Sequence, residues 1–153
     1  MVEMLFYIAI FSILALALIN SLMTMTKAFK QISIHTDLIQ SSSILERISR
    51  DIRQAYGINT ISAGDLKLNT TDELGNNKTV RFLLSGFDVQ LFEDDVLIGN
   101  LNTPNVEVTS LVFTEITTTT GKAIKINLST RSVKDQTGRI EDFYDTLVLR
   151  GVY

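Results

Sequence analysis

The stretch Met4–Thr26, MLFYIAIFSILALALINSLMTMT, sets the organisation of this chain, because its 23 residues include no charge, no proline and no glycine. An α-helix rises 1.5 Å per residue, so a helix over this stretch spans about 35 Å. The hydrocarbon core of a bilayer is about 30 Å thick and takes roughly 20 apolar residues to cross. Glu3 precedes the stretch, and Lys27 and Lys30 follow it. We therefore predict a transmembrane helix over residues 1–26.

Two other interpretations of this apolar stretch are less favoured. A secretory signal peptide has a basic start, a shorter apolar core and a small-residue cleavage site. Here the apolar core is longer, and no A-x-A-like site follows it. The buried core helix of a soluble protein rarely stays uncharged over so many residues in a domain of this size. We therefore expect the segment to be retained as an anchor.

After Thr26 the apolar residues become one-sided. Spacings of four and three separate Ile34, Leu38, Ser41, Leu45, Ile48, Ile52 and Ala55. This pattern is typical of a helix that lies on a core. We predict one helix over residues 2–56 that ends at Gly57, with 27–57 as its amphipathic continuation. The predicted helix–sheet packing residues are Ile34, Leu38, Leu45, Ile48 and Ile52.

From Ile58 onward the pattern changes to a period of two, which is typical of strands. The predicted strands are Asn59–Ser62, Leu66–Thr70, Thr79–Leu84, Phe87–Phe92, Val96–Gly99, Val106–Thr117, Ala123–Thr130 and Tyr144–Arg150. A change of phase near Ser110 predicts a β-bulge. The predicted fold class is α+β: a long N-terminal helix whose 31–56 face packs on an antiparallel β region over 58–153.

Composition excludes some classes of function. The chain carries a net charge of −3, and residues 58–153 hold nine Lys and Arg against thirteen Asp and Glu. A phosphate backbone requires a basic surface, so we expect no direct nucleic-acid binding. The chain has no cysteine, so we expect its β region to be held by packing without disulfides.

The sequence offers little catalytic chemistry. Its single histidine, His35, forms no recognisable catalytic set, and no glycine-rich phosphate loop is present. We therefore predict that the protein is no enzyme and takes no cofactor. Asp88, Glu93, Asp94 and Asp95 are weak candidates for a Ca²⁺ site, because hard cations take oxygen ligands. An acidic hairpin turn is the favoured interpretation of these residues.

The first residues resemble a known family. Val2-Glu3-Met4-Leu5, followed by the apolar run Phe6–Leu14, is similar to the amino-terminal segment of type IV pilins and pseudopilins. Small apolar residues, one glutamate and an unbroken apolar helix mark that segment. The motif covers about the first 25 residues, whereas the helix-then-sheet order covers the whole chain. Glu3 stands two residues nearer the amino terminus than in that family, so no residue is assigned as the processing site.

The resemblance implies a structural subunit without catalysis. It implies prepilin processing with N-terminal methylation, and a role for Glu3 in pairing with the terminal amine of a neighbouring subunit. Size, lack of cysteine and the large β region resemble a minor pilin or minor pseudopilin of a type IV pilus or a type II secretion-like filament. The implied partners are other pilin subunits, membrane lipid before assembly and assembly platform proteins. The implied location is the cytoplasmic membrane, which the chain crosses once with its β region outside. After assembly the protein would be part of a periplasmic or extracellular filament. The alternative is a single-pass anchored adhesin or ligand-binding ectodomain.

Overall fold

The computed structural model describes residues 2–72, 74–118 and 121–149, and over that range the chain forms one helix and eight strands. Helix α1 runs from Val2 to Gln54. The chain divides into two compact units, and the boundary along the sequence lies between His35 and Thr36. Residues 2–35 of α1 belong to the first unit. The rest of α1 belongs to the second unit, together with all eight strands.

The end of α1 differs from the prediction. The helix stops at Gln54, and the N–H of Ala55 donates to the carbonyl oxygens of Asp51 at 3.1 Å and Ile52 at 3.2 Å. Gly57 is the first residue of strand β1, where it pairs with Asn69, so it is not a helix cap. The prediction that Gly57 closes the helix is therefore wrong, because the strand begins almost immediately after the last helical turn.

The strands form two antiparallel sheets, one of five strands in the order β1-β2-β3-β4-β5 and one of three in the order β6-β7-β8. Their bounds are β1 Gly57–Ser62, β2 Asp65–Thr71, β3 Asn77–Ser85, β4 Asp88–Glu93, β5 Val96–Asn100, β6 Val106–Thr118, β7 Gly121–Ser132 and β8 Ile140–Val148. The α+β fold class is confirmed, with a helix packed on antiparallel sheet. Strand β8 begins four residues before the predicted start at Tyr144, because Ile140–Phe143 pair with β7 despite their charges. The predicted bulge is also present, as a register shift between Val108 and Ser110.

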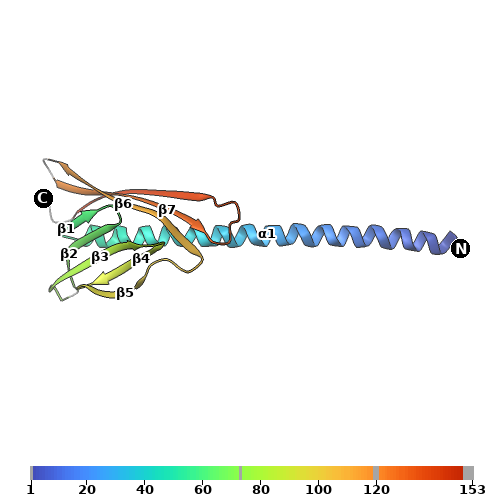
Figure 1. Ribbon diagram of the computed structural model, residues 1–153, viewed down its shortest axis with the longest axis horizontal. Helices are drawn as coiled ribbons and strands as arrows, with labels where there is room; N and C mark the ends of the chain where they lie inside the picture. Colours follow the sequence, from blue (N-terminus) through green and yellow to red (C-terminus); the bar gives the residue numbers. More distant parts are fainter. Residues whose placement is uncertain (1, 73, 119–120, 150–153) are drawn as a thin grey trace. The chain divides into compact units, whose positions relative to one another are not determined.

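The two sheets approach each other where β1 meets β6. An antiparallel bridge joins Ala63 to Val112, and the N–H of Leu84 donates to the carbonyl oxygen of Gly64 at 2.7 Å. Gly64 has a φ of +76°, and a Cβ built there would lie 3.4 Å from the Leu84 Cβ. Glycine suits this crossing because it adopts a positive φ without strain and lets the backbones approach. Strands β5 and β8 are consequently the outer edges of the β region. Figure 1 shows β5 at the lower border of the strands, on the side away from β6 and β7.

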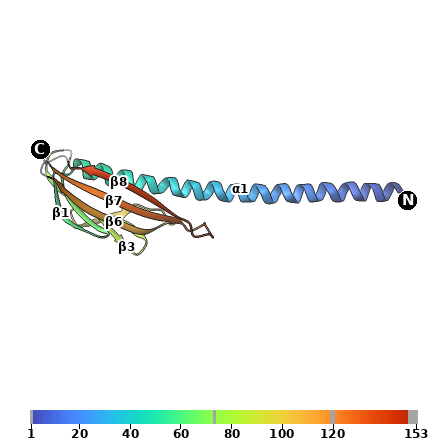
Figure 2. The same cartoon turned by 90° about the horizontal axis from the view of Figure 1, so that it is seen from above.

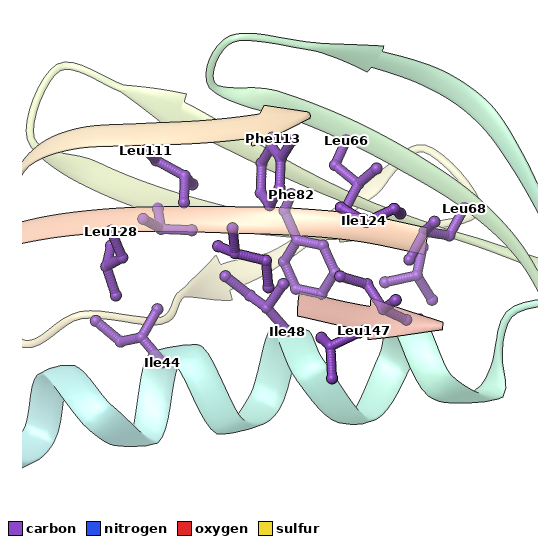
Figure 3. Close-up of a cluster of buried hydrophobic side chains, with 14 of the residues drawn as sticks. Ile44, Ile48, Leu66, Leu68, Phe82, Leu111, Phe113, Ile124, Leu128 and Leu147 are labelled. Atoms are coloured by element: carbon purple, nitrogen blue, oxygen red, sulfur yellow. The ribbon is translucent and has the colours of Figure 1, made fainter. Parts of the chain in front are cut away.

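One apolar core fills the space between the sheets and the carboxyl-terminal part of α1. Figure 3 shows Ile44 and Ile48 rising from α1 toward Leu128, Phe82 and their neighbours. The cluster contains Ile44, Ile48, Ile52, Ala55, Leu66, Leu68, Val80, Phe82, Val89, Leu91, Val108, Leu111, Phe113, Ile124, Ile126, Leu128, Leu147 and Leu149. Side chains from both sheets and from the helix are shared in it, so the second unit folds around a single core.

Candidate functional site

Apolar side chains surround α1 over the uncharged stretch 4–26 of the first unit. Leu5, Phe6, Tyr7 and Ile8 are four successive residues, and each leaves at least 60% of its surface exposed. Successive helical residues are rotated by about 100°, so four in a row cover the whole circumference. A helix that is apolar all round requires lipid or other protein around it. It is the one helix in the described chain that is long and apolar enough to cross a membrane.

Three hydroxyl groups in this unit bond to the helix itself. Ser12 donates to the carbonyl oxygen of Ile8 at 2.8 Å, Thr24 to that of Asn20 at 2.9 Å and Thr26 to that of Leu22 at 2.9 Å. These are bonds to the carbonyl four residues earlier, which satisfy a hydroxyl without water. An apolar medium can therefore accept this segment, because its backbone and these hydroxyls are already hydrogen-bonded.

Glu3 lies in the first turn of α1 and is exposed. Partial positive charge at a helix amino terminus favours a carboxylate there. In an apolar surrounding, however, a carboxylate is costly unless a positive charge pairs with it. Glu3 therefore has a favourable local position, and an apolar surrounding would require a positively charged partner for it.

The predicted packing residues of α1 lie in different settings. Ile48 and Ile52 have no exposed surface, and Leu45 is half-buried against the core. Ile34 falls in the first unit, as does the exposed His35. The side chain of Leu38 lies outside the described residues.

A row of polar contacts continues this interface toward Thr36. The hydroxyl of Ser132 donates to the Asp37 carboxylate at 2.9 Å, and that of Thr130 donates to the Ser41 hydroxyl at 2.9 Å. The Lys134 ammonium lies 3.3 Å from the same Asp37 carboxylate, which is only 3% exposed. We call these contacts of Asp37 and Ser41 with β7 and Lys134 the polar seam.

The polar seam and the apolar core both lie along the contact between α1 and β7, where the repeats of the helix and the strand match in length. Four helical residues advance about 6 Å and two strand residues about 6.8 Å, so the two patterns stay aligned. As the helix passes from Asp37 to Ser41, β7 passes backward from Ser132 to Thr130, so α1 and β7 are antiparallel. Farther along the same face lie the buried side chains of Ile44, Ile48 and Ile52 on α1 and of Leu128, Ile126 and Ile124 on β7.

Sequence reasoning identified Ser41 on this face but missed Asp37, Ile44 and Ser49. Ile44 is 2% exposed and Ser49 is 5% exposed, and the Ser49 hydroxyl donates to Asp145 on β8 at 2.9 Å. Figure 2 shows β8 alongside the carboxyl-terminal part of α1. The series 37, 41, 44, 48 is as periodic as the predicted one. The two series share Ser41 and Ile48 and differ at Asp37 and Ile44, where the apolar neighbours Leu38 and Leu45 fitted the predicted stripe equally well.

The four weak candidates for a Ca²⁺ site each bind a different partner within the chain. Asp94 and Asp95 form the two-residue turn between β4 and β5, with φ of 49° and 64°, as a type I′ hairpin requires. Asp94 accepts from the N–H of Thr79 at 2.8 Å, and Asp95 pairs with Lys67 at 2.7 Å. The other two bind elsewhere: Glu93 pairs with Lys78, and Asp88 accepts from Asn102. Over the described residues no group of three or more ligating side chains is suited to a metal ion.

A charged cluster borders the helix on the side of the five-stranded sheet. Arg47 pairs with Asp51 at 3.1 Å and lies 3.8 Å from Glu93 on β4. Burial raises the pKa of Asp51 above its ordinary value, and the neighbouring Arg47 guanidinium only partly offsets that effect. Arg47 thus connects Asp51 on its own helix with Glu93 on β4.

The chain matches no protein-family model, no curated protein and no solved structure. Its layout is nevertheless pilin-like: a long amino-terminal apolar helix whose carboxyl-terminal part packs on antiparallel sheet.

Proposed function

We propose that this protein is a minor pilin or minor pseudopilin, a structural subunit of a type IV pilus or a type II secretion-like filament. The observation that carries the proposal is the continuity of α1 from Val2 to Gln54. Residues 4–26 of the helix are apolar on every side, whereas its last third is held in the core of an antiparallel β domain.

The proposed mechanism is physical. Before assembly, lipid surrounds the apolar helix and the β domain lies outside the membrane. On assembly, helices of neighbouring subunits bundle, and the same apolar surface then contacts protein. Helices associate in lipid through close packing and through polar groups that find partners. An enzymatic step has no place in this mechanism.

Glu3 has a specific part in the proposal. Inside an apolar helix bundle, an unpaired carboxylate raises the free energy. In the proposed filament, the positive charge close to Glu3 is the terminal ammonium of a neighbouring subunit. The pair forms only at the correct axial offset. It therefore selects the register of neighbouring helices more than it adds bulk stability.

Glu3→Ala tests this role directly. We expect the variant to insert into the membrane and to keep the β domain folded, while co-purification with other pilin subunits is lost or strongly reduced. Glu3→Gln is the matched control, because it keeps the size of the side chain and removes only its charge. It should fail like Glu3→Ala if charge pairing is the mechanism.

Equal recovery of partner subunits with wild type and both variants would remove Glu3 from the mechanism. It would then favour an anchored adhesin or ligand-binding ectodomain, for which the charge at this position has no consequence. Both variants are compared in the full chain, expressed with its natural partner subunits and extracted in mild detergent.

A further inference from the structure

Asn20 is the most polar side chain within the apolar stretch 4–26 of α1. It is exposed, and over the described residues its side-chain amide makes no hydrogen bond. The backbone carbonyl oxygen of Asn20 accepts from the Thr24 hydroxyl at 2.9 Å, but this contact does not involve the amide. The amide therefore has two N–H donors and one carbonyl oxygen that the chain itself does not bind.

The hydroxyl groups of the same stretch can be satisfied by the helix. Those of Ser12, Thr24 and Thr26 donate to the carbonyl oxygen four residues earlier. The neighbouring Ser21 hydroxyl can reach its own backbone in the same way, by rotation about one bond. A carboxamide differs, because the interior of a helix has no free N–H to donate to its oxygen. Asn20 is consequently the side chain at this depth that needs a partner outside the helix.

Depth in the membrane excludes water as that partner. Lys27 is the first charge after the apolar stretch, and Asn20 precedes it by seven residues. This separation is about 10 Å along a helix axis, which the short side chain of asparagine does not span. A polar group held in hydrocarbon without hydrogen bonds raises the free energy of the inserted helix. In lipid, a second helix is therefore the source of the missing donor and acceptor.

Small side chains flank Asn20 on its own face of α1. Residues three and four apart in a helix are neighbours, which places Ala17 before and Thr24 after Asn20 on this face. Small residues let two helix backbones approach closely, and only then can a short amide reach across. The opposite face carries Leu18 and Leu22, which are 61% and 63% exposed. A second helix therefore fits α1 more closely at Asn20 than on the opposite face.

A second copy of this chain has the complementary group at the required place. Copies inserted with the same topology run parallel and carry Asn20 at the same depth. A two-fold axis between parallel helices brings the same patch of each helix into contact. Because a carboxamide both donates and accepts, each Asn20 amide can donate to the oxygen of the other. A different protein fits this patch only if it has a polar group at the same depth.

We propose that α1 forms a parallel pair with α1 of a second copy of this chain, and that the two Asn20 amides hydrogen-bond to each other in the membrane. The proposal rests on the proposed anchoring of α1 in a bilayer. It concerns the stage before assembly, when lipid otherwise surrounds the apolar helix. Subunits would then wait in the membrane as dimers until the filament takes them up.

Cysteine cross-linking locates the contact, and the sequence contains no cysteine of its own. The full chain is expressed without other pilin subunits, and intact membranes are oxidised. Ala17→Cys and Thr24→Cys, each made singly, should give disulfide-linked dimers, because both positions flank Asn20. Leu18→Cys and Leu22→Cys on the opposite face are the matched controls and should give far fewer dimers.

The contribution of the amide is measured by Förster transfer between labelled copies at increasing ratios of lipid to protein. Asn20→Leu keeps the approximate size of the side chain and removes the amide. We expect its dimerisation to be weaker by about 3- to 30-fold, as for hydrogen bonds between membrane helices. Asn20→Gln keeps the amide and should retain most of the dimer. Ser12→Ala removes a hydroxyl that is bonded within the helix, so it should change nothing.

Three results would overturn the proposal. The first is an equal yield of dimers, or none, from the cysteines on both faces of α1. The second is unchanged dimerisation of Asn20→Leu. The third is dimers that appear only when other pilin subunits are present, which would make the partner a different protein. Normal co-purification of partner subunits in the Glu3 experiment would leave the proposed function standing in each case. Absence of the chain from the membrane fraction would instead contradict the anchoring on which both proposals depend.

Discussion

Two carboxylates on the second unit have pKa values shifted in opposite directions. Burial raises the pKa of Asp51 from 3.8, against the effect of Arg47. Asp72 has its pKa lowered from 3.8, chiefly because Asn76 donates to it from its side chain at 3.0 Å and from its backbone N–H at 2.8 Å. The same side-chain type therefore opposes folding at one position and favours it at the other.

Asp51→Asn should raise the free energy of unfolding at pH 7. Just above pH 3.8 the folded chain keeps a proton on Asp51 that the unfolded chain has lost, so stability falls as pH rises through this window. At neutral pH the ionised carboxylate therefore lowers stability. We expect a gain of no more than about 1 kcal/mol, because the lost pair with Arg47 offsets part of it. Urea unfolding of the full chain in detergent, at several pH values, measures the difference between variant and wild type, which should shrink toward pH 4.

Asp72→Asn is the matched control with the opposite sign. Because the pKa of the Asp72 carboxyl is lowered, its ionised form stabilises the folded chain above pH 3.8. This contribution is lost as the pH falls through the lowered pKa. The variant should be less stable than wild type at pH 7 and should approach it in acid. A parallel pH dependence of the two variants would contradict the assignment of burial at one site and hydrogen bonding at the other.

At the scale of elements, the polar seam fixes how α1 lies along β7. Apolar side chains at Ile44, Ile48 and Ile52 repeat every four residues, so the apolar part alone would tolerate a shift of the helix by one turn. A shift in one direction would place the Ser41 hydroxyl against the apolar Leu128, and a shift in the other would place the apolar Ile44 against the Thr130 hydroxyl. Buried polar groups of this kind contribute specificity of register more than net stability.

A double-mutant cycle on Ser41 and Thr130 tests the seam. Both residues have no exposed surface, and their hydroxyls lie 2.9 Å apart. Thr130→Val or Ser41→Ala alone leaves one buried hydroxyl unpaired, which should lower the free energy of unfolding by about 1–3 kcal/mol. The double variant leaves no orphaned partner, so it should be less destabilised than the sum of the singles. Additive effects in urea unfolding would show that the two hydroxyls do not depend on each other.

At the scale of the whole molecule, the chain joins a segment suited to lipid to a domain with a conventional core. We expect residues 36–153 to lie outside the cytoplasmic membrane. Protease added to spheroplasts should then remove the β domain and leave a membrane-bound fragment of α1. Protection of the β domain until the cells are lysed would contradict this topology, and a cytoplasmic marker protein controls for leakage.

The apolar helix, the α+β class and all eight strands could be predicted from the sequence, because each depends on local periodicity of side chains. Periodicity also placed Ile48 and Ile52 on the packed face and the bulge near Ser110, since a change of phase is visible within one strand. It identified Glu3 as an unusual carboxylate beside an apolar run, but no contact in the described chain defines its partner.

The pairing of the strands could not be predicted from the sequence, and neither could the division of the β region into two sheets with β5 and β8 at its edges. Pairing depends on where loops bring distant segments, and a period of two is the same for an edge strand and a central one. The structure likewise revealed that Asp37 and Ser41 are buried, because their burial follows from hydroxyl partners on β7 about 90 residues later in the chain. A polar residue is placed inside a protein by its partner, and that partner is found only when the chain is folded.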